Sequence, residues 1–246
     1  MLGAQAAALV GVHIVDKLRK ERVPHVAGGF PTFPPLDTQV EGTEVRTYTE
    51  GTSLYEDMLE AITSAKDYIF FESYIWRADA WGKRFKSALL SAAKRGVDVH
   101  IVYDGFAVLN QDPFFYVFPK TPHLYIRRFP EIRSGMFTMN LRKTGRDHRK
   151  ILVVDDKVAF VGGYNIGDPF ALEWRDTGDA VSELKYGFID FWNHFKRHGQ
   201  PSIARTRAPR WDSEVSLAFN QPSRLLYPVR GLYIDAIDRA RSSIRI

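Results

Sequence analysis

Apolar and polar positions repeat with two different periods along the chain, and each change of period marks a new element. After residue 50 a helical spacing appears in Met58, Leu59, Ala61, Ile62 and Ala65. Ser53 followed three positions later by Glu56 is a capping-box pattern, which predicts that this amphipathic helix begins near Ser53. Residues 68–76 come next and are dense in aromatic and β-branched side chains, so they predict a buried strand.

A second helix and a second strand continue this pattern. One apolar face is marked by Phe85, Ala88, Leu89, Ala92 and Ala93. Gly96 stands where a left-handed C-terminal cap is expected, and residues 97–103 predict the next strand. Strand, helix and strand at these lengths form a βαβ unit, which predicts a sheet that is largely parallel and covered by helices.

The rest of this region predicts further elements of an α/β fold. Residues 123–129 predict a strand, and residues 151–154 and 158–161 predict two short strands joined by a tight connection. Residues 181–195 predict a helix, because their apolar positions recur at helical spacing. The expected fold class is therefore α/β, with a largely parallel sheet covered by helices.

The N-terminal 44 residues read differently from the remainder. Residues 23–44 are rich in Pro, Gly and Thr and predict a linker. The apolar run 2–15 before it is shorter than the roughly 20 residues that span a membrane. It is followed by the charged segment 16–22, so it suits a helix that rests among anionic headgroups. A helix packed on its own domain remains the alternative.

An internal repeat appears near the C-terminus. Residues 59–62 (LEAI) align with residues 234–237 (IDAI) at an offset of 175, and the same offset superposes Ala65 on Ala240 and Ile69 on Ile244. The predicted organisation is a helix and linker at 1–44, a first domain at 45–210 and the beginning of a second copy at 211–246. The chain is thus expected to be a fragment with one complete half.

The composition limits which catalytic groups and which partners the chain can have. The chain has 246 residues and no cysteine, which excludes disulfides, a thiolate nucleophile and cysteine-bound zinc. A formal charge of +5 and a pI near 9.3 favour anionic partners such as phospholipid headgroups or nucleic acid. A balance of this size is also common in proteins that bind neither.

The strongest chemical signal is a pair of basic side chains. His148 and Lys150 are two positions apart, so on an extended segment both emerge from the same face. An imidazole can attack phosphorus or move a proton, and an ammonium can neutralise the charge on the non-bridging oxygens. The pair therefore predicts a site for a phosphodiester.

Residues that follow the pair extend this prediction. Asp155 is an odd number of positions from His148, so it should face away and brace the turn. Gly162 and Gly163 would let backbone N–H groups approach an oxyanion, and Asn165 can add an amide donor.

These residues resemble a known family. The HxKxxxxD motif and the trailing GGxN signature of the phospholipase D superfamily are matched by His148, Lys150, Asp155, Gly162, Gly163 and Asn165. The chain is also similar to the cardiolipin synthase branch from about Val45 onward, through residues 71–76, 103–105, 165–167 and 174–176. The resemblance implies the phospholipase D-like fold, an α-β-α sandwich with a mixed, largely parallel sheet.

The resemblance also implies a mechanism and a set of residues. It implies a two-step phosphatidyl transfer in which His148 becomes a phosphohistidine and the histidine of a second motif protonates the departing alcohol, with no metal or cofactor. The implied catalytic set is His148, Lys150, Asp155, Asn165 and Asp176, and the implied phosphate-binding set is Lys150, Gly162, Gly163 and Asn165. Asp176 would orient the imidazole; the alternative is that it pairs with Arg175 or caps a turn.

Two departures from the family pattern stand out. The short strand that usually follows the Trp-Arg-Asp-Thr segment is expected to be missing, since Gly178 comes directly after Thr177. A second HxKxxxxD motif is absent from the sequence. Loss of the general acid that it supplies would slow catalysis by roughly two to four orders of magnitude.

Partners and location follow from the same resemblance. It implies phosphatidylglycerol as substrate, a second half-site from another polypeptide segment, and peripheral attachment to the cytoplasmic face of a bacterial membrane. Two alternatives stay open. One is a phospholipase or nuclease of this superfamily that completes its site as a dimer, although nucleic acid is the less favoured partner. The other is a non-catalytic lipid-binding module that holds phosphate through Arg142, Lys143, Arg146 and Arg149.

Overall fold

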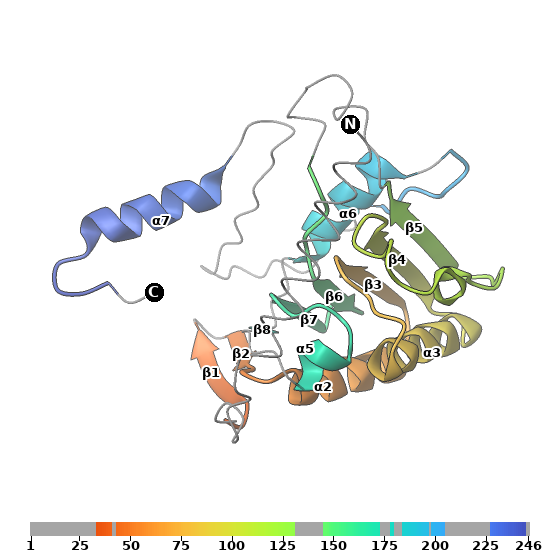
Figure 1. The fold of residues 1–246 in the computed structure, drawn as a ribbon, viewed down its shortest axis with the longest axis horizontal. Coiled ribbons are helices and arrows are strands. Elements are labelled where there is room, and N and C mark those ends of the chain that lie inside the picture. Colours follow the sequence, from red (N-terminus) through yellow and green to blue (C-terminus); the bar gives the residue numbers. More distant parts are fainter. Residues whose placement is uncertain are drawn as a thin grey trace, which may run out of the picture. The chain divides into compact units, whose positions relative to one another are not determined.

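The structure is a computed structural model (Figure 1). It describes residues 33–40, 43–130, 145–172, 178–179, 184–196, 198–204 and 227–244. The elements in chain order are β1 (Leu36–Val40), β2 (Thr43–Thr47), α2 (Gly51–Ser64), β3 (Tyr68–Ser73), α3 (Ala80–Lys94), β4 (Asp98–Asp104), η1 (Pro113–Tyr116), β5 (Leu124–Phe129), β6 (Ile151–Val154), β7 (Val158–Gly162), α5 (Asp168–Leu172), β8 (Gly178–Asp179), α6 (Leu184–Phe195) and α7 (Pro228–Arg239). The apolar segment 2–15 lies outside the described residues.

The main sheet has six strands in the order β5-β4-β3-β6-β7-β8. β3 pairs in parallel with β4, and β4 with β5, as the βαβ pattern predicts. The α/β class and the mixed sheet are therefore confirmed. The expectation of a largely parallel sheet is wrong, because β3–β6, β6–β7 and β7–β8 are all antiparallel. The tight β6–β7 hairpin forces one of these reversals, since a connection this short joins only antiparallel strands.

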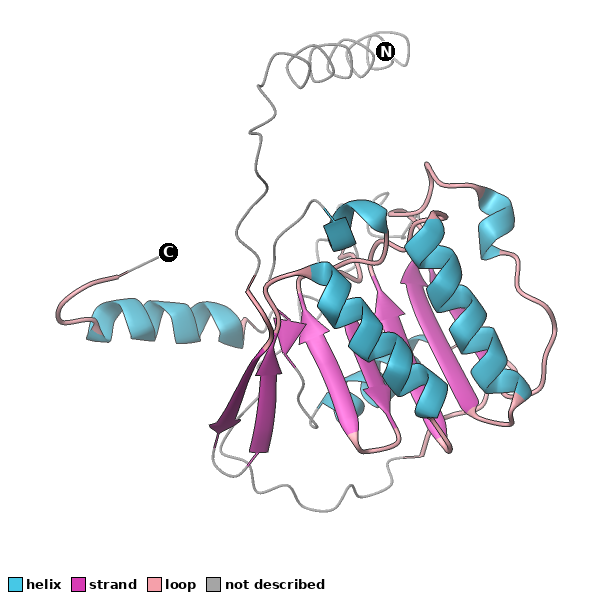
Figure 2. Cartoon of the chain, turned by 90° about the horizontal axis from the view of Figure 1, so that it is seen from below, coloured by secondary structure: helices cyan, strands magenta, loops and turns pink. Residues whose placement is uncertain are grey.

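Helices cover the two faces of this sheet and create two separate apolar cores. Figure 2 shows two long helices side by side on one face. Ile69 and Phe71 of β3 pack on that face with residues of α2 and α3, whereas Phe70 packs on the opposite face with α6. Alternate residues of a strand point to opposite faces, so β3 contributes to both cores.

His100 of β4 is buried among aromatic rings on the α6 face. Its ring stacks on Tyr125 with centroids 4.6 Å apart and meets Trp192 edge-on at 4.7 Å. Burial lowers the pKa of His100 to about 4, although Asp98 opposes the shift. The neutral imidazole is therefore the stable form in the folded protein at neutral pH.

Acid should weaken the fold through His100. The unfolded chain binds a proton at the ordinary pKa of 6.5 and the folded chain only near 4, so the free energy of unfolding falls as pH drops through this range. The full loss is about 3 kcal/mol. Urea denaturation at pH 7.5 and 5.0 measures about 2 kcal/mol of this loss, because pH 5.0 is still above the folded pKa of about 4. His100→Phe is expected to show a smaller loss between the two pH values, and an equal loss would contradict the assignment.

The predicted linker at 23–44 is wrong for its last part. Residues 36–40 and 43–47 form an antiparallel hairpin of β1 and β2. Arg46 and Tyr48 attach this hairpin to α2, because both donate to the Asp57 carboxylate. Alternating Thr, Val and charged residues supply the strand pattern that the neighbouring prolines obscure. The hairpin belongs with the unit Thr32–Ile246 rather than with an N-terminal linker.

The end of α3 agrees with the sequence prediction, whereas the beginning of α2 differs from it. Gly96 follows α3 with a φ of +94°, which confirms the left-handed cap. The capping box of α2 is wrong. The helix begins at Gly51, the Ser53 hydroxyl donates to Glu50, and Glu56 instead pairs with Arg84 of α3.

The sheet ends at the short edge strand β8. The strand expected to be missing after Thr177 is present as β8, which pairs with β7 through Val161–Asp179 and Gly162–Gly178. At the offset of 175, Ser64 at the end of α2 corresponds to Arg239 at the end of α7, as the repeat predicts. The division at residues 210 and 211 stays a prediction. In the described part of the chain, no helix has the length and apolar character needed to cross a membrane.

Candidate functional site

The His148 and Lys150 side chains meet at the carboxyl end of β3 and β4. The Lys150 ammonium lies 3.1 Å from His148 Nδ1 and 3.3 Å from Nε2, and it donates to the His148 carbonyl at 2.7 Å. His148 is exposed, while Lys150 is 9% exposed. Imidazole and ammonium therefore project together, and the exposed imidazole is open to an incoming anion.

Local electrostatics favour the unprotonated form of the His148 imidazole. Burial lowers the pKa of His148, and the Lys150 charge lowers it further. Asp147 and Asp104 act in the opposite direction but do not reverse the shift. A neutral imidazole has a free lone pair, which is the form that a nucleophile needs.

Asp104 holds the segment that carries His148. It is completely buried at the end of β4, and one carboxylate oxygen accepts from the Asp147 backbone N–H at 3.1 Å. The other oxygen accepts from the N–H groups of Phe106 and Ala107. Burial raises the pKa of Asp104, whereas these N–H donors lower it. Asp104 of β4 thus holds the segment that leads into β6, although β3 lies between these two strands.

Arg149 points to the opposite face from its two neighbours in the motif. Its guanidinium lies 2.5 Å from Glu72 and 3.3 Å from Asp147, and both of those carboxylates are buried. It also donates to the Gly187 carbonyl of α6 and lies 4.0 Å from the centroid of the Phe191 ring. Burial raises the pKa of Glu72, and the Arg149 charge opposes that rise.

This placement corrects one part of the lipid-binding alternative. Arg149 is committed to an internal ion pair rather than to a phosphate-binding surface. Arg146 is half-buried, and its guanidinium lies 4.4 Å from the centroid of the Phe106 ring and donates to the Pro130 carbonyl. Arg142 and Lys143 lie outside the described residues.

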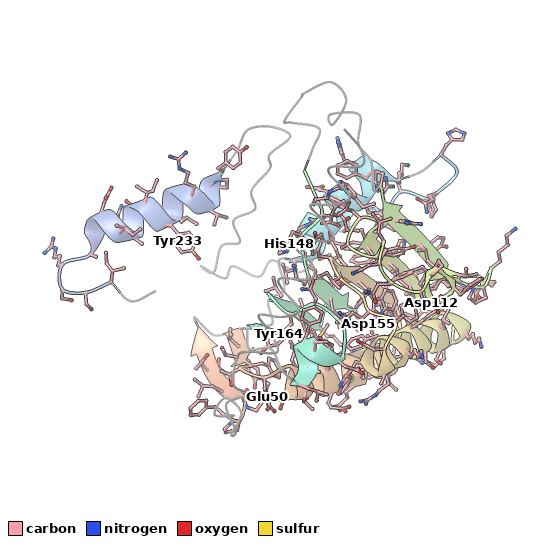
Figure 3. All side chains as sticks on the ribbon, viewed as in Figure 1. Glu50, Asp112, His148, Asp155, Tyr164 and Tyr233 are labelled. Atoms are coloured by element: carbon pink, nitrogen blue, oxygen red, sulfur yellow. The ribbon has the colours of Figure 1, made fainter. Side chains whose placement is uncertain are left out.

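Asp155 braces the turn, as its parity with His148 predicts. It adopts a φ of +52° at the end of β6, and its carboxylate accepts from the backbone N–H groups of Lys66, Asp67 and Tyr68. Figure 3 labels Asp155 and His148, which stand at different ends of β6. These contacts give Asp155 a structural part in the motif.

Asn165 joins the tail of the signature to the segment after β3. Its amide oxygen accepts from the Ile75 N–H at 3.0 Å, and its carbonyl accepts from the Tyr55 hydroxyl. The next residue, Ile166, forms a parallel bridge with Trp76. The amide NH2 of Asn165 is thereby oriented as the donor end of the side chain.

Of the two glycines, Gly162 lines a cavity together with Lys150. Gly162 is the last residue of β7 and Gly163 follows it. Gly162 and Lys150 line the same cavity of about 20 Å³, together with Glu72 and Ser73. This space holds about one water molecule, so a phosphate group would have to bind on the exposed side of the pair.

Tyr74 is a site residue that the sequence patterns did not single out. The centroid of the Tyr74 ring lies 4.5 Å from the centroid of the His148 ring and 5.3 Å from the Lys150 ammonium. Only its place in the segment 71–76, directly after β3, hinted at this role. Asp176 lies outside the described residues. Within the described ranges, no three His, Cys, Asp or Glu side chains are grouped to hold a metal ion.

Comparison with known families agrees with this geometry. Residues 58–175 match the family model described as "Cardiolipin synthase, PLD-like domain". The chain therefore carries a phospholipase D-like domain.

Curated relatives narrow the class further. The chain is 30% identical over 223 residues to the major cardiolipin synthase ClsA of Bacillus subtilis (strain 168), covering 84% of this chain and 45% of that protein. It is also 30% identical over 224 residues to cardiolipin synthase 1 of Staphylococcus aureus (strain COL), covering 83% and 44%. The chain is thus a homologue of cardiolipin synthases and spans a little under half of their length.

Two solved structures resemble this chain in fold. NucT from Helicobacter pylori has a TM-score of 0.47 and 16% identity, covering 61% of this chain and 93% of that chain. Nuc from Salmonella typhimurium, a phospholipase D family member, has a TM-score of 0.43 and 20% identity, covering 65% and 93%.

Proposed function

We propose that this chain supplies one half-site of a cardiolipin synthase-like phosphatidyltransferase. One observation carries the proposal: the exposed imidazole of His148 and the ammonium of Lys150 lie 3.1 Å apart. The named relatives at 30% identity support phosphatidylglycerol as the substrate.

In the first step, His148 attacks the phosphorus of phosphatidylglycerol. A P–N bond forms and the P–O bond to the leaving glycerol breaks, so the glycerol oxygen takes a proton from an acid. Lys150 neutralises charge on the non-bridging oxygens as they approach the transition state. In the second step, a hydroxyl of another phosphatidylglycerol attacks the phosphohistidine and the P–N bond breaks. The hydroxyl proton passes to the conjugate base of the acid that protonated the glycerol. The products are cardiolipin and glycerol.

The proton donor is proposed to come from a second half-site. The sequence contains one HxKxxxxD motif, and acid catalysis of this kind contributes roughly two to four orders of magnitude. A second motif in another segment or in a second copy of the chain would provide the donor. Asn165, Gly162 and Gly163 are proposed to add phosphate contacts, and Asp176 to orient the imidazole. The proposed setting is the cytoplasmic face of the membrane.

Product analysis tests this function. The protein as the cell produces it is incubated with phosphatidylglycerol vesicles, and cardiolipin, glycerol and phosphatidic acid are measured. Cardiolipin and glycerol in equal amounts are expected, and both should disappear in His148→Ala. The matched control is His198→Ala, because His198 is exposed and has no part in the site.

Three results would contradict the proposal. Phosphatidic acid as the main product would make water the acceptor and the protein a hydrolase. Undiminished cardiolipin formation in His148→Ala would remove the nucleophile. Absence of any product, with folded protein and vesicle binding intact, would exclude the activity.

A further inference from the structure

The loop between β4 and β5 exposes four large apolar side chains. They are Phe106 at 48% exposed, Leu109 at 60%, Phe114 at 80% and Val117 at 65%. We call these four residues the apolar loop surface. Soluble proteins rarely gather such residues within one short segment unless something contacts them.

This loop is fixed in place by its other residues. Val108 and Phe115 are buried in the core on the α2–α3 face, and the Tyr116 hydroxyl donates to the Trp76 carbonyl. Lys86 of α3 donates to the Val117 carbonyl at 2.9 Å. The inward residues thus hold the loop, while the apolar loop surface makes no comparable contribution to the core.

The charges around this surface are mainly positive. Arg146 lies over the Phe106 ring at 4.4 Å, and Lys120 is exposed three residues beyond Val117. Asp112 is the one carboxylate between residues 105 and 130, and its side chain accepts from the Phe114 N–H. Aromatic and aliphatic side chains flanked by cations suit the interface of an anionic bilayer, where the rings enter the headgroup region and the cations meet phosphates.

The apolar loop surface begins beside the site. The loop leaves β4 at Asp104, whose carboxylate accepts from Asp147, the residue before His148. Arg146, which covers Phe106, is two positions before His148. A bilayer that contacts Phe106 therefore brings lipid phosphates to the edge of the sheet where His148 and Lys150 project.

We infer that the apolar loop surface is the membrane-docking surface of this domain, and that its partner is a bilayer containing anionic phospholipid. This inference deepens the proposed function and rests on it for the identity of the bound lipid. Docking through this surface lets the domain act on lipids that remain in the bilayer, so only their phosphate groups have to reach His148.

A site-specific fluorescent label tests the docking position. The chain has no cysteine, so Phe114→Cys and Leu109→Cys each give a single labelling site for an environment-sensitive dye. Phosphatidylglycerol vesicles are expected to shift the emission of both labels to shorter wavelength. Leu36→Cys is the matched control, because Leu36 is 62% exposed on β1, and its label should not respond. Labels at 109 and 114 that stay unchanged on vesicle-bound protein would overturn the inference.

Flotation with vesicles measures the contribution of the same side chains. Leu109→Gln and Phe114→Gln are each expected to lower the vesicle partition coefficient about tenfold, while Leu36→Gln leaves it unchanged. Lys120→Glu should weaken binding to phosphatidylglycerol vesicles but not to phosphatidylcholine vesicles. Equal losses in the Leu36 variant, or no loss at all, would overturn the inference.

Two further measurements distinguish membrane docking from a protein interface and from catalysis. If Phe114→Gln abolishes a concentration-dependent dimer in sedimentation without changing vesicle binding, the surface is a protein interface and the inference fails. His148→Ala should bind vesicles like the wild type. Intact docking without cardiolipin formation would therefore reject the proposed function alone, whereas cardiolipin formation with unaffected labels would reject docking alone.

Discussion

Lys150→Met is expected to slow transfer of the phosphatidyl group to His148 by about 10²–10³-fold. Loss of a preorganised group that stabilises charge in the transition state usually has an effect of this size. The ammonium lies 3.1 Å from the imidazole, so a phosphate bound to one also meets the other. The variant should also raise the pKa of His148, because the Lys150 charge helps to lower it. The acid limb of the pH–rate profile is therefore expected to move to higher pH.

A control on the same hairpin separates this effect from general loss of charge. Lys157 is exposed in the turn that joins β6 to β7, at the other end of β6 from His148. Lys157→Met should retain both the rate and the pH profile. Rapid-mix trapping of labelled phosphoenzyme measures the rate, and circular dichroism checks the fold. A Lys150 variant that keeps wild-type rate and profile would show that the ammonium has no part in the transition state.

Arg149→Met is expected to lower the free energy of unfolding by about 3–5 kcal/mol. The substitution removes the cation that lies between Glu72 and Asp147 and leaves two buried carboxylates facing each other. It also removes the hydrogen bond to the Gly187 carbonyl, which ties the segment before β6 to α6. Urea denaturation at pH 7.5 measures the loss.

An exposed ion pair provides the comparison. Arg84 pairs with Glu56 between α3 and α2, and both side chains are about half exposed. Arg84→Met is expected to lower stability by about 0.2–1 kcal/mol, as exposed pairs usually do. If Arg149→Met costs no more than Arg84→Met, the internal pair does not stabilise the fold.

Features set by nearby residues could be predicted from the sequence. Helical and strand periods located the βαβ unit, Gly96 marked the end of α3, and the hairpin of β6 and β7 followed from two short apolar runs. The parity rule placed His148 and Lys150 on one face and Asp155 at the turn. Each of these depends on backbone geometry over a few residues.

Contacts between residues that are far apart in the sequence could not be predicted from these local patterns. Glu72 and Arg149 are far apart in sequence, and only the antiparallel register of β3 and β6 brings them together. Tyr74 reaches His148 for the same reason. The β1–β2 hairpin was missed because Pro and Gly dominate its surroundings, while its attachment to Asp57 is tertiary. The expected share of parallel strands was too high because the order of strands is not local information.

Mapping the phosphorylated residue tests the central claim most directly. The wild-type protein is mixed with phosphatidylglycerol vesicles, quenched at alkaline pH to preserve phosphohistidine, digested and analysed by mass spectrometry. An acid-labile phosphatidyl group on His148 is the expected result, with none on His148→Ala. An adduct on another residue, or an adduct that persists in the variant, would contradict the assignment of His148 as the nucleophile.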